Sequence, residues 1–329
     1  MKLGIIGSGM IAHETLPYFL EASIEVVAIA GTARSHNKTC DLARTYGIDE
    51  SMVFDDYTQL IALAGLDAVY VAVPNYLHYE MTKAALLAGK SVICEKPLAA
   101  THEQAQEMAR IAREAGLFLW EAIVPMHQPS FAVIKDAVSE LGEIRIAQVH
   151  FCQYSSRYNA FMAGTILPAL DPACAGGALM DLGVYNLSML LGLFGAPKSA
   201  QYVPNIQHGI DTSGIMTLDY GNFKALGVCS KDSNAPSGLW VQGTSGYLVL
   251  TGAPSDCGAF ELHFNDGRVE KRGHAEPSRF LQEFTDFRTQ WEAGDRETCY
   301  AELEQSLEVS RVLHGMRREA GITFPADEA

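Results

Sequence analysis

Two short segments of the sequence combine residue types that can hold and release a proton. In the stretch VICEKPLAA, an apolar run ends abruptly and is followed by Glu95 and Lys96, with Pro97 directly behind them. In the stretch AGGALMDLGVYNLSML, Asp181 and Tyr185 are four residues apart, so on a helix they share one face. Lysine and tyrosine side chains can both serve as acid or base at a reacting oxygen. The two segments are therefore candidates for proton-transfer chemistry.

The first 120 residues, which must position the first segment, alternate between the patterns of strands and helices. Apolar, β-branched runs predict strands, and the runs between them predict helices. Strands are expected over 2–7, 24–31, 52–54, 66–74, 90–94 and 117–122, and helices over 13–22, 38–47, 56–65, 78–89 and 102–116. Thr101 and Gln104 have the spacing of a capping box at the start of the last helix. This order predicts an α/β fold with a doubly wound, parallel Rossmann sheet.

The turn after the first strand carries the pattern G-x-G-x-x-A. In this pattern Gly7 allows the sharp turn, Gly9 lets a pyrophosphate approach the backbone, and Ala12 lets the helix pack close to the strand. A Gly-rich turn without a ligand can have the same letters, but its position between a strand and a helix favours a dinucleotide site. The residues expected at this site are Gly7, Ser8, Gly9, Met10, Ile11 and Ala12.

The end of the second strand indicates which dinucleotide binds. Sites that prefer NAD usually place an Asp or Glu about 20 residues after the glycines, where it binds the ribose 2′-OH. Here that place holds Thr32 and Arg34, with Lys38 nearby, and the first acid after them is Asp41. Because hydroxyl and guanidinium groups bind a 2′-phosphate, the sequence favours NADP(H) over NAD(H). The alternative is that Arg34 only opens the next helix at the surface.

Two further strand ends complete the predicted crevice. Ligands of such sheets bind beyond the carboxyl ends of the strands. Pro74, Asn75 and His78 follow the fourth strand, and Glu95 and Lys96 follow the fifth. We expect these residues to line the cofactor site, although His78 fits a solvent-facing helix start equally well.

The motifs GSGMIA, PNYLH and EKP, in this order, resemble the glucose-fructose oxidoreductase/inositol dehydrogenase/MocA family. The resemblance is most specific over residues 1 to about 125 and again over 176–195. It implies a Rossmann domain and then an α+β domain with a large, mostly antiparallel sheet that often pairs subunits, so we expect a homodimer or a higher homo-oligomer. It also implies an NAD(P)-linked dehydrogenase or reductase acting on sugars, polyols and related cyclic alcohols, and a cis bond between Lys96 and Pro97.

The second half of the chain has a different order of elements. Strands are predicted over 143–154, 199–207, 211–221, 223–230, 238–252 and 259–265, and helices over 127–142, 277–294 and 299–321. Strands in succession followed by helices indicate an α+β architecture. We therefore predict an NAD(P)-binding domain over 1–121 and a substrate-binding and dimerisation domain over 122–329.

The second chemical segment departs from the family pattern, which is roughly D-x-G-x-H-x-x-D. Asp181 and Gly183 match it, whereas Tyr185 replaces the histidine and Ser188 replaces the last aspartate. This departure resembles the branch that contains dimeric dihydrodiol dehydrogenase, NADP-linked xylose dehydrogenases and glucose-fructose oxidoreductase itself. It weakens the transfer of a substrate from the inositol dehydrogenase branch. The alternative is a buried helix with a hydrogen-bonded tyrosine and an aspartate near its start.

The resemblance implies a division of roles at a substrate hydroxyl. Oxidation of an alcohol needs a base for the hydroxyl proton while hydride leaves the carbon, and reduction needs the reverse. Lys96 is expected beside the nicotinamide, where burial and the positive ring lower its pKa. Tyr185 acts at the same oxygen as acid, base or hydrogen-bond donor, and Asp181 orients the substrate or Lys96. Glu95 is expected to bind the nicotinamide ribose or carboxamide, and whether Lys96 or Tyr185 carries the proton stays open.

Two residues are weaker candidates for substrate contacts. Arg157 follows the first long strand of the second half and suits an anionic or polyhydroxyl substrate, but it fits a surface or interface position equally well. His127 lies where the chain crosses between the predicted domains, and it fits a helix start at least as well as a pocket.

Composition excludes several classes of protein. The formal net charge of −15 disfavours nucleic acid and anionic membranes as partners. The seven cysteines form no CxxC pattern and the ten histidines form no HExxH motif, so we expect neither disulfides nor a metal site. The N-terminus makes a poor signal peptide and no run of 18 apolar residues is present, so we expect a cytoplasmic protein.

Two classes of function remain for the chain. The first is an NADP(H)-dependent oxidoreductase with a small-molecule substrate. The second is a sensor or regulator that keeps the nucleotide site without chemistry. The presence of Lys96, Asp181 and Tyr185 together favours the enzyme, because a sensor needs only the nucleotide loop.

Overall fold

The strands predicted over the first 122 residues pair side by side in a parallel sheet. In the computed structural model, which describes residues 1–274 and 278–328, the strand order is β3-β2-β1-β4-β5-β6. The chain reverses its direction of progress across the sheet between β1 and β4, which is where ligands of doubly wound sheets bind. The strands span Lys2–Ile6 (β1), Glu25–Ala30 (β2), Val53–Phe54 (β3), Ala68–Val71 (β4), Ser91–Glu95 (β5) and Leu119–Ala122 (β6).

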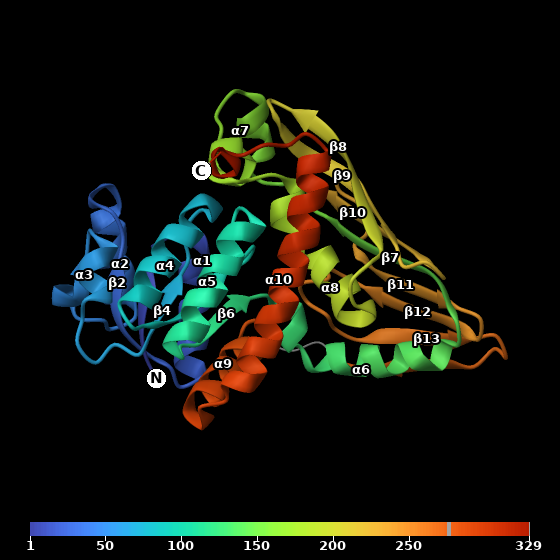
Figure 1. The fold of residues 1–329 in the computed structure, drawn as a ribbon, viewed down its shortest axis with the longest axis horizontal. Coiled ribbons are helices and arrows are strands. Elements are labelled where there is room, and N and C mark those ends of the chain that lie inside the picture. Colours follow the sequence, from blue (N-terminus) through green and yellow to red (C-terminus); the bar gives the residue numbers. More distant parts are fainter. Residues whose placement is uncertain (275–277, 329) are drawn as a thin grey trace. The chain divides into compact units, whose positions relative to one another are not determined.

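Helices connect these strands, and further helices follow in the second half (Figure 1). Strands β4 and β5 are buried along their whole length, as strands covered on both faces must be. Thr101 Oγ1 accepts the N–H of Gln104 at 3.2 Å, so the predicted cap forms at the start of α5. The helices span Met10–Glu21 (α1), His36–Thr45 (α2), Tyr57–Ile61 (α3), His78–Leu87 (α4), His102–Ala115 (α5), Pro129–Val138 (α6), Tyr158–Met162 (α7), Val184–Phe194 (α8), Leu281–Ala293 (α9) and Arg296–Glu319 (α10).

A segment from the far end of the chain completes the first of two units. The chain divides into residues 1–122 with 280–307, and residues 123–279 with 308–329. Phe284 of α9 stacks on Phe19 of α1, with ring centroids 3.9 Å apart, and lies edge-on to Tyr70 of β4. The predicted boundary near residue 121 lies beside the observed division. Segment 280–307, however, which the prediction assigned to the second domain, packs with the first unit. Residue 277, where a helix was predicted to begin, lies outside the described residues.

The second unit contains a larger sheet, which is mostly antiparallel as the resemblance implied. Over the described residues its order is β14-β13-β12-β11-β7-β10-β9-β8, and β7 and β10 run parallel. Strand β14 and helix α7 were not predicted, because their short, mixed sequences have no clear period. The strands span Ile144–Cys152 (β7), Ser199–Gln207 (β8), Ile210–Asp219 (β9), Lys224–Ser230 (β10), Gly238–Gly243 (β11), Gly246–Thr251 (β12), Phe260–Phe264 (β13) and Val269–Arg272 (β14).

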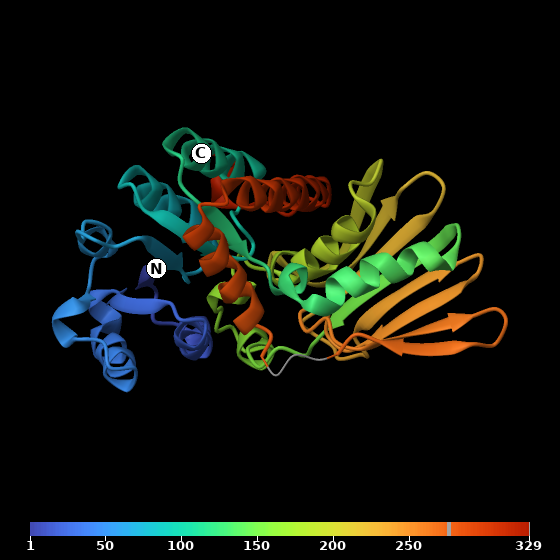
Figure 2. The same ribbon diagram turned by 90° about the horizontal axis from the view of Figure 1, so that it is seen from below.

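This sheet has one covered face and one open face. Helices α6 and α8 lie over one face, and within the described part of the second unit no helix lies over the other (Figures 1 and 2). The alternation in β7 agrees, because Ala147, Val149 and Phe151 are buried whereas Gln148 and His150 are partly exposed. One face therefore belongs to the core and the other is available to a further layer.

The segment that leads into α8 is apolar and contains a π-helical turn. By length and composition alone, Pro172–Phe194 could cross a membrane, but 72% of its most apolar window is buried inside the protein, as in a core helix. A π-helical turn, Leu179–Gly183 (η8), precedes α8, and such turns are frequent at functional sites. Asp211 of β9 accepts the N–H of Leu179 at 2.7 Å, and a Cβ on Gly177 would lie 2.1 Å from Asp211 Oδ1. The glycine thus lets the carboxylate anchor this turn.

Candidate active site

The register of the parallel sheet brings the predicted cofactor residues to one edge. Ile6 of β1 pairs with Ala30 of β2 and with Val71 of β4, and Val71 pairs with Cys94 of β5. Because these strands run in the same direction, the residues that follow them gather at the carboxyl edge. The segments that follow the strands at this edge begin at Gly7, Gly31, Ala72 and Lys96.

The segment after β1 can hold a pyrophosphate. Gly7 has a φ of +113°, and a Cβ there would lie 2.2 Å from the carbonyl oxygen of Ala72, so the turn requires glycine. Gly9 precedes α1 without a side-chain cap, and the place of its missing Cβ is open space. Ala12 is fully buried. The uncapped N–H groups of the helix start therefore adjoin a space that suits an anion.

Hydroxyl groups hold the loop after β2 close to this glycine turn. Thr39 Oγ1 of α2 donates to Ser8 Oγ at 2.9 Å, and a Cβ on Gly31 would lie 2.3 Å from Thr39 Oγ1. The N–H of Thr32 donates to Ser35 Oγ at 2.9 Å across the 3-10 turn Ala33–Ser35. The loop that carries the predicted 2′-phosphate residues is thereby fixed.

This loop presents positive charge at the place where an NAD site carries an acid. Arg34 and Lys38 are exposed, and neither forms an ion pair with the described residues. Asp41, the first acid after them, is paired with Arg44 at 2.8 Å. Two cations without an ion-pair partner among the described residues, close in sequence to exposed Thr32, suit a phosphate better than a ribose hydroxyl.

His78 lies in the interior, where both of its ring nitrogens face backbone carbonyl groups. It is fully buried, with Nδ1 2.9 Å from the carbonyl oxygen of Pro97 and Nε2 2.9 Å from that of Val73. Burial lowers the pKa of His78, so the neutral ring, with one N–H, donates to one carbonyl at a time. The ring holds the loop after β5 to the end of β4. The solvent-facing alternative for His78 is wrong, and a contact with the cofactor stays a prediction.

The loop that carries Lys96 is held from the other side as well. Tyr70 of β4 donates to Glu95 Oε1 at 2.5 Å, and burial raises the pKa of Tyr70 well above its usual value. Lys96 is partly buried, and the Lys96–Pro97 bond is cis, as the resemblance implied. A glutamate that accepts from a buried tyrosine is oriented rather than mobile, which suits the binding role predicted for Glu95.

Glu121 contacts the loop that carries Lys96, and the sequence did not single it out as a candidate. It lies near the end of β6, pairs in register with Cys94 of β5, and accepts the N–H of Leu98 at 2.8 Å. Burial raises the pKa of Glu121 to about 7, and the charge of Glu95 adds to this rise whereas that of Lys96 opposes it. A charged residue within the apolar run LFLWEA was the available signal. Glu121 therefore supports the lysine loop and changes its charge near neutral pH.

In the second unit, Asp181 has a buried cationic partner. Lys231 Nζ donates to Asp181 Oδ2, and the side-chain exposures are 4% for Lys231 and 33% for Asp181. Lys231 directly follows β10. In the sequence it therefore has the same pattern as Lys96, which is a lysine at the end of an apolar strand. A nearly buried lysine both neutralises Asp181 and restricts its rotation. The sequence reasoning overlooked Lys231.

Tyr185 lies one turn after Asp181 on the same helical segment. Its ring is partly buried and packs 5.5 Å from that of Phe151 on β7. Asp181 and Tyr185 thus belong to the second unit, whereas Lys96 belongs to the first. The action of Lys96 together with these two residues on one substrate stays a prediction.

The two weaker candidates also lie in the second unit. Arg157 stands at the start of α7, is partly buried, and donates its backbone N–H to Ser155 Oγ at 3.2 Å. His127 ends the 3-10 turn Val124–His127 (η4) and is buried. Their contacts with a substrate stay predictions.

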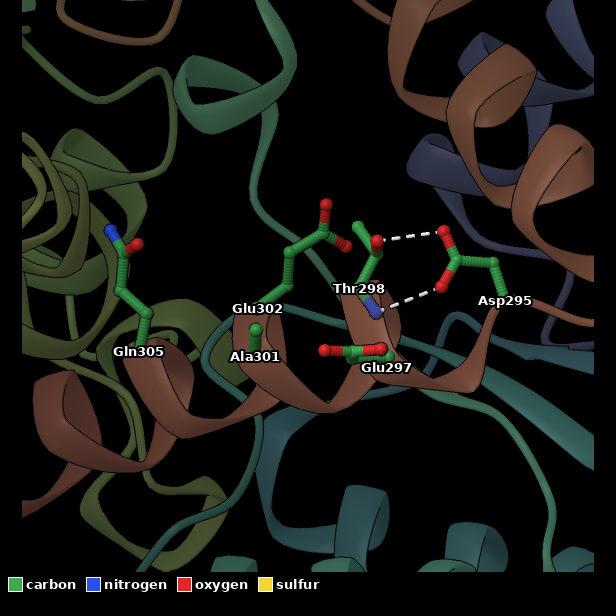
Figure 3. A pocket seen from close by; sticks show the side chains of 6 residues that line it. All are labelled: Asp295, Glu297, Thr298, Ala301, Glu302 and Gln305. Atoms are coloured by element: carbon green, nitrogen blue, oxygen red, sulfur yellow. Dashed lines mark hydrogen bonds between the residues drawn. The ribbon is translucent and has the colours of Figure 1, made fainter.

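An acidic hollow near the start of α10 is unsuited to the cofactor. Its volume is about 550 Å³, and Asp295, Glu297 and Glu302 contribute carboxylates to its wall (Figure 3). Asp295 accepts the N–H and the hydroxyl of Thr298 at 3.0 and 2.7 Å. A pyrophosphate would be repelled by this negative charge. The residues described contain no group of three or more side chains that could hold a metal ion.

We expect Glu121→Gln to remove a pH-dependent loss of stability. The unfolded chain releases the Glu121 proton near pH 4.3, about the usual glutamate pKa, whereas the folded protein releases it near pH 7. The contribution of Glu121 to the free energy of unfolding is therefore complete below about pH 4.3, the unfolded value, and is lost as the pH rises through 7. An amide still accepts from Leu98 and carries no charge. Relative to wild type, the variant should therefore gain roughly 2 kcal/mol of unfolding free energy between pH 5 and pH 8.

Urea unfolding at these two pH values measures this gain. Glu319→Gln, at an exposed glutamate, is the control and should follow wild type at both. An identical pH dependence of wild type and Glu121→Gln would show that Glu121 does not titrate in this range.

Comparison with known proteins agrees with the two-unit fold. Residues 1–123 match the model of an oxidoreductase family with an NAD-binding Rossmann fold, and residues 131–249 match the GFO/IDH/MocA C-terminal domain. The scyllo-inositol 2-dehydrogenase (NADP(+)) of Bacillus subtilis is 32% identical over 336 residues, which is 100% of both chains. The trans-1,2-dihydrobenzene-1,2-diol dehydrogenase of Mus musculus is 28% identical over 347 residues, which is 100% of this chain and 99% of the mouse protein.

A solved structure shows the same fold. The 3-ketoreductase of Actinomadura kijaniata in complex with NADP superposes with a TM-score of 0.80 at 24% identity, over 97% of each chain. The family models together cover more than half of the chain, and the Bacillus relative covers all of it. The chain therefore belongs to the glucose-fructose oxidoreductase/inositol dehydrogenase/MocA family of oxidoreductases.

Proposed function

We propose that the protein is an NADP(H)-dependent oxidoreductase that interconverts a hydroxyl and a carbonyl group on a sugar, polyol or cyclic diol. One observation supports the proposal above the others: given the register of β1, β2, β4 and β5, the glycine turn, the basic loop and the lysine loop follow strands at the same sheet edge. The bound nicotinamide supplies the hydride acceptor or donor. Family membership supports this redox chemistry.

The basic loop supports NADP(H) over NAD(H). Arg34 and Lys38 have no ion-pair partner among the described residues, and exposed Thr32 adds a hydroxyl donor. A 2′-phosphate would bind these groups through charge-assisted hydrogen bonds, which are the stronger kind. The B. subtilis relative is named as an NADP(+) enzyme.

We assign proton transfer to Lys96 and Tyr185, and substrate orientation to Asp181. Lys96 stands on a loop that is hydrogen-bonded at Glu95, Pro97 and Leu98, so the ammonium is presented by a fixed backbone. In the oxidation direction one of the two groups takes the hydroxyl proton, and in reduction it returns that proton to the carbonyl oxygen. Asp181, neutralised by Lys231, accepts a neighbouring substrate hydroxyl.

We propose a substrate class that includes inositol-type polyols as well as diols. The departure at Tyr185 had weakened the expectation of an inositol-type substrate. An NADP(+)-dependent inositol dehydrogenase that matches along the whole chain supports cyclic polyols as strongly as the dihydrodiol dehydrogenases support diols. We therefore place cyclic polyols and diols first among the substrates to test.

We further propose a cytoplasmic homodimer joined by the open face of the second sheet. Val203 and Ile215 are exposed on that face, where the pairing places them side by side, and Ile215 is also paired with the partly exposed Val228. Farther along the same face, Trp240 packs on His150, with ring centroids 5.0 Å apart. A second copy would bury this surface, which is otherwise costly to leave in water. The net charge of −15 supports the absence of nucleic-acid and membrane partners.

We expect Lys96→Ala to abolish turnover while leaving cofactor affinity nearly unchanged. Removal of an acid–base group lowers kcat by about 10²- to 10⁴-fold. NADP+ reduction is followed with a panel of inositols, aldoses and cyclic diols, and NADP+ binding is measured by titration. Lys135→Ala, at an exposed lysine of α6, is the control. Wild-type protein that binds NADP+ tightly but turns over no member of the panel would instead favour a sensor.

We expect Arg34→Ala to weaken NADP+ binding specifically. Hydrogen bonds to charged groups contribute about 1.5–3 kcal/mol, so the dissociation constant should rise roughly 10- to 100-fold. The dissociation constant for NAD+ should not change, and Arg110→Ala on α5 should affect neither cofactor. The assignment is wrong if wild type binds NAD+ more tightly than NADP+, or if Arg34→Ala binds NADP+ as wild type does.

We expect Ile215→Asp to convert the dimer to a monomer. The new charge would lie on the open sheet face, where 46% of the isoleucine is exposed in the single chain. Sedimentation equilibrium measures the mass, and Leu87→Asp, at an exposed leucine of α4, should remain dimeric. A monomeric wild type, or a dimeric Ile215→Asp variant, would exclude this interface.

A further inference from the structure

Three side chains of the first unit form a chain of contacts that resembles an activated thiol. Cys40 Sγ lies 3.4 Å from His36 Nε2, and His36 Nδ1 lies 2.8 Å from Asp55 Oδ1. A thiol next to an imidazole that a carboxylate orients is the arrangement of nucleophile, base and orienting group in covalent catalysis. The cofactor site and the proposed hydride transfer make no use of these residues.

The fold brings the three residues together for simple reasons. His36 and Cys40 lie one turn apart on α2, so both project from the same face of that helix. Asp55 directly follows β3, and β3 pairs with β2 at Ala30 and Phe54. The carboxylate therefore comes from the sheet edge to meet the helix, and it fixes the imidazole ring through Nδ1.

The other cysteines have unlike surroundings. Among the described residues, Cys40 and Cys174 are partly exposed, whereas Cys94, Cys152, Cys229, Cys257 and Cys299 are buried. Cys174 Sγ contacts Asp171 rather than a base, and burial together with that carboxylate raises the pKa of Cys174 to about 11. Cys40 thus combines access to solvent with a proton acceptor, and Cys174 is a natural control within the same chain.

We propose that Cys40 is a thiol-modification site, activated by His36 and Asp55, that undergoes exchange with a low-molecular-weight disulfide such as glutathione disulfide. His36 Nε2 takes the thiol proton, and Asp55 stabilises the imidazolium that forms. The Cys40 sulfur attacks one sulfur of the disulfide, a new S–S bond forms, and the old one breaks. The leaving thiolate receives the proton from His36, so protein thiol and disulfide give mixed disulfide and free thiol.

The position of Cys40 couples this modification to the cofactor. Lys38 lies two residues before Cys40 on α2, and Arg34 lies in the turn that precedes the helix. Lys38 and Cys40 project from different faces of α2, because residues two apart on a helix do not share a face. A glutathionyl group would therefore act on these cations through its carboxylates and its net negative charge rather than by direct contact. It would therefore compete with the 2′-phosphate and weaken NADP(H) binding, a consequence that rests on the proposed cofactor assignment.

Mass spectrometry of the protein incubated with glutathione disulfide tests the site itself. Cys40 should be modified about tenfold faster than Cys174, and His36→Gln and Asp55→Asn should each slow the reaction at Cys40 without slowing that at Cys174. Thermal melting and NADP+ binding identify any variant that has not folded. Equal rates at the two cysteines, or a rate at Cys40 that neither variant changes, would overturn the proposal.

Cofactor titration of the modified protein tests the coupling. The glutathionylated wild type should bind NADP+ about tenfold more weakly, with NAD+ affinity unchanged, and dithiothreitol should restore binding. Cys40→Ser should bind NADP+ normally and be insensitive to the disulfide, whereas Cys174→Ser should respond as wild type does. Rapid modification of Cys40 with unchanged NADP+ affinity would refute the coupling. Unmodified protein that prefers NAD+ would instead refute the cofactor assignment and leave the thiol site standing.

Discussion

The structure of the first unit depends on how one loop, residues 95–98, is held at the end of β5. Three buried side chains from three neighbouring segments bind it. Tyr70 donates to Glu95, His78 contacts the carbonyl of Pro97, and Glu121 accepts the N–H of Leu98. A loop with buried polar groups needs partners for each of them, because an unsatisfied group costs about 1–3 kcal/mol. The clamp that satisfies these groups also presents Lys96 from a fixed backbone.

The side chains that hold this loop bring ionisable groups close together. The free-energy cost of this arrangement depends on which of the groups are protonated. Burial of Glu121 near the carboxylate of Glu95 disfavours its charged form, so it is neutral in acid and gains charge near pH 7. Its ionisation would place a negative charge in the surroundings of Lys96. The second unit uses the opposite solution for Asp181, where the nearly buried ammonium of Lys231 balances the carboxylate. Both arrangements orient a side chain or a loop through a hydrogen bond to a buried partner.

Local signals predicted the strands and helices well where a segment has one clear period. The run that became β5, the glycine turn before α1 and the cap at Thr101 are of this kind. The packing of segment 280–307 with the first unit could not be predicted from such local signals. An amphipathic helix shows that it has a buried face, but not which sheet that face covers. Tertiary contacts decided that choice, among them the stacking of Phe284 on Phe19 and the hydrogen bond from Trp120 to Gln290.

By itself the sequence determined the family, the parallel sheet and the residues at its carboxyl edge, because periodicity and glycine spacing act over a few residues. It also determined Lys96, Asp181 and Tyr185 as candidates by residue type. The tertiary structure decided their partners, because contacts such as that of Lys231 with Asp181 join residues 50 positions apart. It likewise brought Asp55 to His36 and Cys40. Long-range contacts depend on strand order and packing, which no local pattern records.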